Sequence, residues 1–157
     1  MVNRVPMTTQ GHAKLREELR RLKEEVRHKL SQEIGKAREL GDLSENAEYH
    51  AAKEKQGQVE AQIRDMEDRF SRAEVVEVSR LSGSRVVFGA TVTVEDGDGE
   101  KAVYQIVGTE EADPKAGKIS FESPIARGLI GKQEGDTVQV KTPRGVKELD
   151  IMKVEFI

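Results

Sequence analysis

Three acidic residues, Asp42, Glu45 and Glu48, stand close together in the sequence between two long helical patterns. Carboxylate oxygens are ligands that Mg²⁺ prefers in proteins, and the ion usually keeps several waters when one or two carboxylates bind it. Asp42 and Glu45 are therefore candidate magnesium ligands. Two protein carboxylates are too few for a tight site, so a second macromolecule would have to supply the remaining ligands.

The same acids also fit a purely structural pattern. Asp42 followed by Glu45 is typical of a capping box, in which the first side chain accepts from the first helical turn and the second bonds back. Gly41 would then end the preceding helix. The two roles are compatible, because a carboxylate that caps a helix keeps other lone pairs.

Basic residues flank the acids on both sides. Lys36 and Arg38 precede them, and Lys53 and Lys55 follow. Such side chains could meet the phosphates of a nucleic acid while the acids meet the metal. Taken alone, the simpler interpretation is that they are solvated surface side chains.

Composition excludes several classes of chemistry. The 157 residues include no cysteine, so disulfides, thiolate metal sites and thiol nucleophiles are all excluded. The histidines are scattered through the sequence and form no metal-binding spacing. The net charge is −3, and residues 1–77 hold 15 Lys+Arg against 16 Asp+Glu, so neither half is basic enough to hold a nucleic acid by itself.

No stretch of the sequence is as apolar as a signal peptide or a membrane span requires. We therefore expect a soluble, cytoplasmic protein with no membrane partner.

A change in composition and in the spacing of apolar residues divides the chain into two expected domains, 1–78 and 79–157. The first has few glycines and apolar residues at helical spacing, whereas the second is rich in Gly, Val, Ile and Thr with alternating apolar residues. The fold class is therefore α+β. The first domain is expected to be an antiparallel α-helical coiled-coil hairpin about 45 Å long, since a helix rises about 1.5 Å per residue. An oligomerisation coiled coil is the alternative.

Two apolar stripes are predicted to face each other in the hairpin. The first helix is expected to open at Thr8 or Thr9. Its stripe contains Leu15, Leu19, Leu22, Val26, Leu30, Ile34, Ala37 and Leu40. The stripe of the second helix contains Tyr49, Ala52, Gln56, Val59, Ile63, Met66, Phe70 and Ala73. Charged pairs such as Glu60 and Arg64 are expected to lie on the solvated faces.

The second domain is predicted to be a small sheet with one short helix. Its strands are expected at residues 85–88, 91–95, 102–107, 118–122, 137–141 and 147–155, separated by turn signals. Ser123 and Pro124 are expected to begin the helix, with proline in its first turn.

Residues 41–54 (GDLSENAEYHAAKE) closely resemble the tip signature of the bacterial transcript cleavage factors of the GreA type. The likeness extends along the chain. Residues 6–8, Gly11 and residues 14–19 resemble the opening of that family, and residues 87–94 (VFGATVTV) and 123–131 (SPIARGLIG) resemble its C-terminal signatures. The tip signature and the two C-terminal signatures are three long motifs in the family's order, which is more specific than any spacing argument.

The resemblance implies a factor that binds bacterial RNA polymerase through its secondary channel. It would stimulate the polymerase's own cleavage of the RNA 3′ end in backtracked, arrested complexes, without being an enzyme itself. The two acids of the family tip correspond to Asp42 and Glu45. They would help the polymerase retain a second Mg²⁺ and orient the attacking water, while the isolated protein holds no metal.

The resemblance also assigns contacts to other residues. Asn46 and Tyr49 are candidates to support the acids or to contact RNA, with packing in the hairpin as the alternative for Tyr49. The second domain would have an FKBP-like fold and would bind the polymerase at the rim of the secondary channel. The residues expected in that docking contact are Ser123, Pro124, Ile125 and Arg127, with an ordinary helix cap and buried helix as the alternative.

Two rival functions come from other classes. A peptidyl-prolyl isomerase would need an aromatic-lined apolar pocket, and the second domain has few aromatic residues and no tryptophan. A non-catalytic coiled-coil interaction protein would bind polymerase without stimulating RNA cleavage. A cleavage assay therefore separates the second rival from the function that the resemblance implies.

Overall fold

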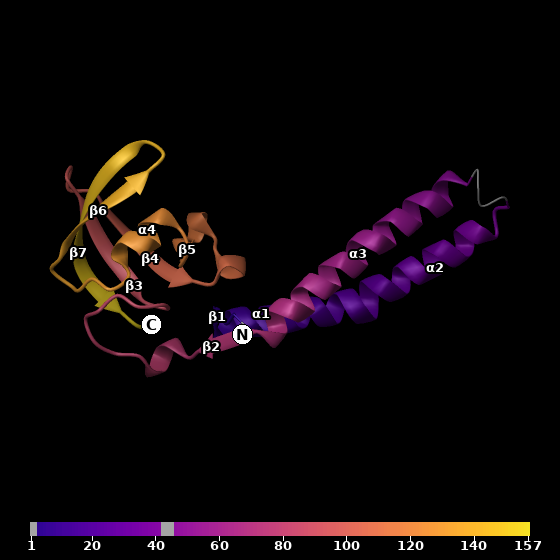
Figure 1. Ribbon diagram of the computed structural model, residues 1–157, viewed down its shortest axis with the longest axis horizontal. Coiled ribbons are helices and arrows are strands. Elements are labelled where there is room, and N and C mark those ends of the chain that lie inside the picture. Colours follow the sequence, from indigo (N-terminus) through magenta and orange to yellow (C-terminus); the bar gives the residue numbers. More distant parts are fainter. Residues whose placement is uncertain (1–2, 42–45) are drawn as a thin grey trace. The chain divides into compact units, whose positions relative to one another are not determined.

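The computed structural model describes residues 3–41 and 46–157 and has the predicted α+β class. It divides into two compact units. One combines Asn3–His12 with Ala73–Ile157 and is called the sheet unit here, and the other, Ala13–Arg72, is called the hairpin. Figure 1 shows α2 (Arg27–Arg38) and α3 (Ala47–Ser71) running side by side in the hairpin and the strands curling around α4 (Pro124–Leu129) in the sheet unit. None of the described helices is long and apolar enough to cross a membrane.

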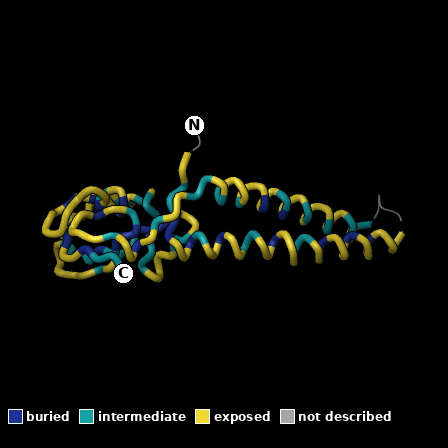
Figure 2. The backbone as a smooth tube through the Cα atoms, turned by 90° about the horizontal axis from the view of Figure 1, so that it is seen from below, coloured by how far each residue is buried: buried dark blue, intermediate teal, exposed yellow. Residues whose placement is uncertain are grey.

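The hairpin is built from two helical arms. The elements are α1 (Thr9–Arg21), a π-helix η1 (Leu22–Val26), α2 (Arg27–Arg38) and α3 (Ala47–Ser71). The predicted stripes largely face each other: Leu22 and Leu30 are buried against Val59 and Ile63, and buried positions recur along the facing sides of the helices (Figure 2). Leu40 was wrongly placed in the stripe. It is 66% exposed because α2 ends at Arg38, and residues beyond that point leave the helical face.

The π-helix explains the irregular spacing of the first stripe. From Leu22 to Ile34 the apolar residues recur every fourth residue, whereas a regular α-helix has 3.6 residues per turn, so such a stripe would drift around the helix. In η1 the Arg27 N–H donates to the Leu22 carbonyl, five residues back. This wider turn absorbs the extra residue. Leu22 and Leu30 are therefore both buried against α3.

Ion pairs cross between the two arms of the hairpin. The Arg27 guanidinium makes two bonds to the Glu60 carboxylate, at 2.8 and 2.9 Å, and Lys23 lies 2.8 Å from Glu67. The hydrogen bond from Arg27 lowers the pKa of Glu60, and the same bond raises the pKa of Arg27. Glu60 was expected to pair with Arg64 one turn away, but its hydrogen-bonded partner lies on the opposite arm.

The sheet unit has a five-stranded sheet. Its strands are β3 (Thr91–Asp96), β4 (Lys101–Val107), β5 (Lys118–Ser120), β6 (Thr137–Thr142) and β7 (Gly145–Glu155). Their order is β5-β4-β3-β7-β6, and within this sheet β4 and β5 are parallel while the other neighbours are antiparallel. Helix α4 (Pro124–Leu129) covers the buried face, where Ala126 and Leu129 are fully buried with Val92, Ile106 and Ile151.

The strand predicted at residues 85–88 is wrong. Arg85 makes only an isolated bridge to Gln133, and the buried Val86 exchanges backbone bonds with Lys132 and Gly131 in the turn after α4. The apolar run of residues 86–88 contains one fully buried valine and forms no sheet ladder.

A second, two-stranded parallel sheet was not predicted. It pairs β1 (Val5–Thr8) with β2 (Ala73–Val76), so the start of the chain joins the segment that follows α3. Three 3₁₀ helices complete the unit: η2 (Val78–Arg80), η3 (Thr109–Glu111) and η4 (Pro114–Ala116). The predicted domains 1–78 and 79–157 follow chain order, whereas the compact units do not, because β1 and β2 both belong to the sheet unit.

Glu111 ties the first residues of the chain to the sheet unit. Its carboxylate accepts from the Thr8 backbone N–H at 3.1 Å, from the Thr8 hydroxyl, and from the Gly108 N–H at 3.0 Å. The Gly11 N–H donates to the Thr8 hydroxyl oxygen at 3.1 Å. A Cβ at residue 11 would collide with the Glu111 carboxyl, so the site requires glycine there.

Candidate functional site

The candidate site lies where α2 ends and α3 begins, a region called the hairpin end below. The last turn of α2 closes through two bonds, from the Glu39 N–H to the Lys36 carbonyl at 3.2 Å and from the Leu40 N–H to the Ala37 carbonyl at 3.1 Å. Gly41 follows with φ of 120°, a conformation that glycine adopts readily. Asp42 and Glu45 lie outside the described residues, and their roles stay predictions.

Asn46 is the cap of α3. Its backbone is extended, with φ −90° and ψ 97°, and its side-chain oxygen accepts from the Tyr49 N–H at 3.0 Å. Its side-chain amide also donates to the Ala37 carbonyl of α2, at 2.5 Å. The capping alternative placed the cap at Asp42. The observed helix begins at Ala47, so its first turn is capped by Asn46.

Arg38 and Tyr49 form a second contact between the two helices. The Arg38 guanidinium carbon lies 5.9 Å from the centroid of the Tyr49 ring, within the range of a cation–π interaction. The Tyr49 ring also meets His50 edge-on, with centroids 5.6 Å apart. Tyr49 is half-buried. Packing in the hairpin, the alternative for Tyr49, is therefore what the structure shows.

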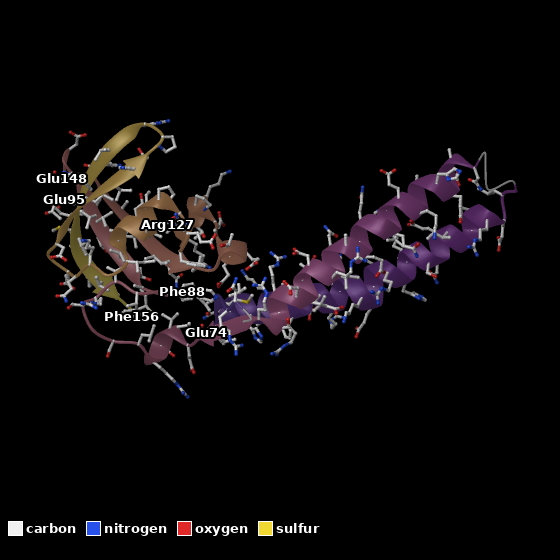
Figure 3. All side chains as sticks on the ribbon, in the orientation of Figure 1. Glu74, Phe88, Glu95, Arg127, Glu148 and Phe156 are labelled. Carbon is white, nitrogen blue, oxygen red and sulfur yellow. The ribbon has the colours of Figure 1, made fainter. Side chains whose placement is uncertain are left out.

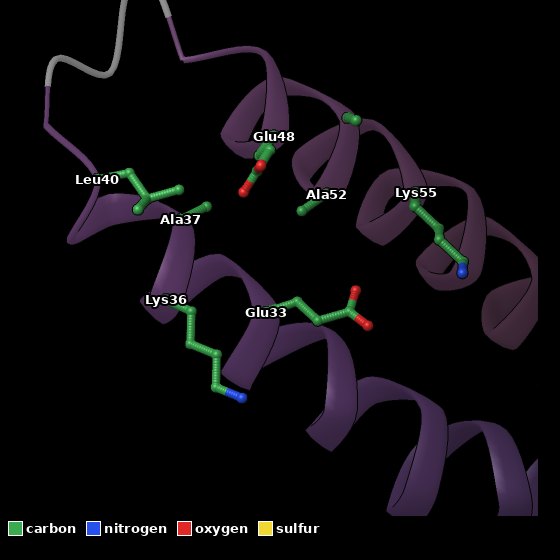
Figure 4. A pocket seen from close by; sticks show the side chains of 8 residues that line it. Glu33, Lys36, Ala37, Leu40, Glu48, Ala52 and Lys55 are labelled. Atoms are coloured by element: carbon green, nitrogen blue, oxygen red, sulfur yellow. The ribbon is translucent and has the colours of Figure 1, made fainter.

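A groove of about 600 Å³ opens between the helices beside these contacts (Figure 4). Its floor is apolar and includes Ala37, Ala52 and the exposed Leu40. The residues that line it are Glu33, Lys36, Ala37, Leu40, Glu48, Ala51, Ala52 and Lys55. Sequence analysis missed this groove. Its only signal was the small side chains at residues 37, 51 and 52, which leave space between the helices.

The predicted basic residues are exposed around the hairpin end. Lys36 and Lys55 line opposite walls of the groove, one from each helix. Lys53 donates to the side-chain oxygen of Gln56 at 3.1 Å. The structure therefore brings cationic groups from both helices to this end, while Arg38 is held against Tyr49.

No group of three or more acidic or histidine side chains in residues 3–41 and 46–157 is arranged to hold a metal ion. By ligand chemistry, Asp42 and Glu45 suit Mg²⁺ but supply only part of its octahedral shell. Any magnesium bound through them would take its other ligands from a partner or from water.

The predicted docking residues surround the start of α4. The Ser123 hydroxyl oxygen accepts from the Ala126 N–H at 3.3 Å and caps the helix, with Pro124 in the first turn. Ile125 is half-buried against the sheet core, while Pro124 and Arg127 are exposed. Figure 3 marks Arg127 in the sheet unit. The alternative was an ordinary cap and a buried helix, and the structure shows such a cap at Ser123. The docking role of the exposed residues stays a prediction.

Ile125 also lines a second hollow, of about 450 Å³, beside the turn between β6 and β7. Arg144, Val146 and Lys147 contribute its other wall. Val146 is 65% exposed. The exposed Val146 side chain, flanked by Arg144 and Lys147, thus lies next to the predicted docking residues. Sequence analysis did not identify this apolar group.

Comparisons with known proteins cover both units. A family model described as the N-terminal part of a transcription elongation factor matches residues 5–75, and one described as the C-terminal part of the transcription elongation factors GreA/GreB matches residues 81–156. Transcription elongation factor GreA of Phenylobacterium zucineum is 56% identical over 99% of this chain and 100% of its own length. The same factor of Bartonella tribocorum is 55% identical over the same shares.

A solved structure, GreA factor homolog 1 of Thermus thermophilus, is 29% identical. The match covers 98% of this chain and 99% of that one, with a TM-score of 0.45. The sequence matches, and not this superposition, carry the family assignment.

Proposed function

Because this chain belongs to the GreA/GreB family of transcription elongation factors, we propose that it rescues bacterial RNA polymerase from backtracked, arrested complexes. The hairpin enters the secondary channel of the polymerase and stimulates the polymerase's own Mg²⁺-dependent cleavage of the RNA 3′ end. Elongation then resumes from the new end. The partners are the polymerase and the nascent RNA inside it, and the compartment is the cytoplasm, where bacterial transcription takes place.

The observation that best supports this proposal is the arrangement of the hairpin end. The two helices stop within bonding distance of each other, with Asn46 joined to Ala37, and the acids Asp42 and Glu45 stand in the chain between them. Lysines from both helices surround the groove beside this point. Such an end combines carboxylates for a metal with cations for phosphates.

Asp42 and Glu45 act on the polymerase site in this proposal. Paired magnesium ions about 3.5–4 Å apart stabilise the attacking and leaving oxygens of a phosphoryl displacement. The two carboxylates supply oxygen ligands that the polymerase site lacks, and they accept hydrogen bonds from the attacking water and so orient it. The chain contributes these groups to the active site of the polymerase, so the protein activates hydrolysis without being the enzyme.

The sheet unit supplies the docking contact. Pro124 and Arg127 are exposed at the start of α4, and Ile125 borders the hollow beside the β6–β7 turn. These groups would hold the factor at the rim of the secondary channel. Docking and chemistry are then carried by different units of the molecule.

A stalled elongation complex with end-labelled RNA tests the proposal. Addition of the protein with magnesium should shorten the RNA. Asp42→Asn and Glu45→Gln should each lower the cleavage rate about tenfold or more, since loss of a metal ligand removes transition-state stabilisation. Both variants should still compete with the wild type for polymerase. Glu39→Gln, which removes an acid beside the hairpin end, is the matched control and should cleave normally.

Magnesium titration of the free protein tests the shared site separately. We expect no binding tighter than roughly millimolar, because two carboxylates make a weak magnesium site. Naked RNA should survive incubation with the protein. Cleavage of free RNA that Asp42→Asn abolishes would show that the factor is an enzyme in its own right.

A further inference from the structure

We propose that Asn46 is a positioning residue for RNA cleavage, because its side chain bonds the end of α2 to the start of α3. This inference rests on the function proposed above. Of the two roles that the resemblance implied for Asn46, support of the acids and contact with RNA, it favours the first and gives it a structural basis in the bond to Ala37.

Both polar atoms of the Asn46 side-chain amide make hydrogen bonds. The oxygen accepts from the Tyr49 N–H at 3.0 Å, and the nitrogen donates to the Ala37 carbonyl. The orientation of the amide is determined by its partners: a backbone N–H requires an acceptor and a carbonyl requires a donor, so the flipped amide would lose both bonds. An asparagine at this position therefore does more than cap a helix.

The Arg38–Tyr49 contact joins the same two helical turns. Arg38 follows Ala37 in the last turn of α2, and Tyr49 lies in the first turn of α3. We call these four residues, Ala37, Arg38, Asn46 and Tyr49, the clasp. Their two contacts, a hydrogen bond and a cation–π interaction, cross the hairpin at one level.

The clasp fixes the two points between which the acidic segment of the chain runs. Fixing chain ends lowers the entropy lost when the segment between them is ordered. Catalytic groups gain most of their effect from position, and a misplacement of about 1 Å can cost about 100-fold in rate. Loss of the Asn46–Ala37 bond should therefore reduce the cleavage rate even where polymerase binding is unchanged.

Two substitutions separate this role from capping. Asp and Ser cap helices about as well as Asn. In Asn46→Asp the donor to Ala37 is missing, and in Asn46→Ser the side chain is too short to reach from the cap to α2. Both variants keep the cap, so their thermal stability should fall only by the small contribution of the bond to Ala37. Asn46→Ala removes the cap as well and should lower it further.

In the stalled-complex assay, Asn46→Asp and Asn46→Ser should lower the maximal cleavage rate about 10- to 100-fold, the range expected for a misplacement of up to about 1 Å. The concentration for half-maximal cleavage should stay the same, because docking lies in the sheet unit. Gln58→Asp and Gln58→Ser change an exposed side chain of the same helix and should match the wild type.

Cleavage at wild-type rates by both Asn46 variants, beside an active wild type, would overturn the inference and leave the proposed function standing. Loss of activity in Asn46→Asp alone would also overturn it, since the added charge would then be the cause. A rise in the half-maximal concentration with an unchanged maximal rate would identify Asn46 as a binding contact instead.

A measurement on the free protein tests the clasp without polymerase. The chain has no cysteine, so spin labels can be attached at Glu39→Cys and Glu54→Cys, both exposed and one on each side of the hairpin end. The distribution of label distances should broaden in Asn46→Ser and stay narrow in Gln58→Ser. Equal widths would overturn the clasp even if the wild type failed to stimulate cleavage.

Discussion

The hairpin and the sheet unit are held together in different ways. In the described residues, the buried apolar cluster of the hairpin has four members, whereas that of the sheet unit has thirteen. The hairpin adds exposed and partly exposed ion pairs, such as those of Arg27 and Lys23 across its arms. Such pairs contribute little to stability, because solvent screens the charges.

This difference matches the division of labour in the proposed function. A sheet packed on a helix forms a stable body on which a docking surface can be built. Two paired helices bury only one stripe each, and the rest of their surface stays exposed. The hairpin therefore has an exposed end and only a small core. Local contacts such as the clasp contribute a larger share of the stability there than in the sheet unit.

The largest expected effect compares two isoleucines of similar burial. Ile151 in β7 is 1% exposed and Ile63 in α3 is 2% exposed. Ile151→Ala should cost about 4 kcal/mol and Ile63→Ala about 2 kcal/mol, because two helices can close on the lost volume more easily than a sheet under a helix. Urea unfolding, with amide hydrogen exchange to separate the units, measures both. Equal losses of unfolding free energy in the two variants would contradict this difference between the two units.

The second prediction concerns how far the sheet unit extends along the chain. Glu111→Ala leaves three donors of Thr8 and Gly108 without their acceptor and should cost about 2 kcal/mol. The hydrogen-exchange rates of the Thr8 and Gly11 amides should rise by the same factor as the rates of the amides in β4. Glu122→Ala, an exposed acid near α4, is the control. Unchanged exchange at Thr8 would place the first residues outside the sheet unit.

A smaller effect is expected at the clasp. Tyr49→Phe keeps the ring beneath Arg38 and should leave the stability of the hairpin unchanged. Tyr49→Leu removes the ring and should cost about 0.5–1 kcal/mol, the value of an exposed cation–π interaction. Thermal unfolding followed by helical circular dichroism measures the difference. The same loss in Arg38→Leu, with no further loss in the double variant, would show that the two side chains act together.

The smallest effect is a pH dependence of the hairpin. The Arg27 hydrogen bond lowers the pKa of Glu60 in the folded protein below its ordinary value of 4.5. The stability that the pair contributes is therefore fully present above pH 4.5 and is lost as the pH falls through the folded pKa. Glu60→Gln should flatten this part of the pH profile. An unchanged profile would show that the pair contributes nothing measurable.

Periodicity alone was enough to predict the two helices and most of their contact. Apolar spacing is a local property of the chain, so Leu22, Leu30, Val59 and Ile63 could be assigned to one core from their positions in the sequence. The same reasoning failed at Leu40, because spacing does not show where a helix stops. It also failed at residues 85–88, where a short apolar run with one buried valine resembles a strand in sequence.

At the candidate site, residue types and the family resemblance predicted roles for Asp42, Glu45 and the neighbouring Asn46 and Tyr49, and these roles stay predictions. They did not show that Asn46 bonds Ala37 or that Arg38 lies over Tyr49. Those contacts depend on the relative rotation and height of two helices, which the packing of the whole hairpin determines. The groove beside them was missed for the same reason, since it exists only where small side chains of two helices face each other.

The sequence by itself therefore determined the α+β class, the two helical arms and the family. Each depends on local patterns or on motifs that can be read in order along the chain. Only the tertiary structure decided that the first residues join the sheet unit through β2 and Glu111, and that Glu60 pairs with Arg27 on the opposite arm. These pairings link residues far apart in the chain, and their partners are chosen by packing geometry and not by sequence spacing.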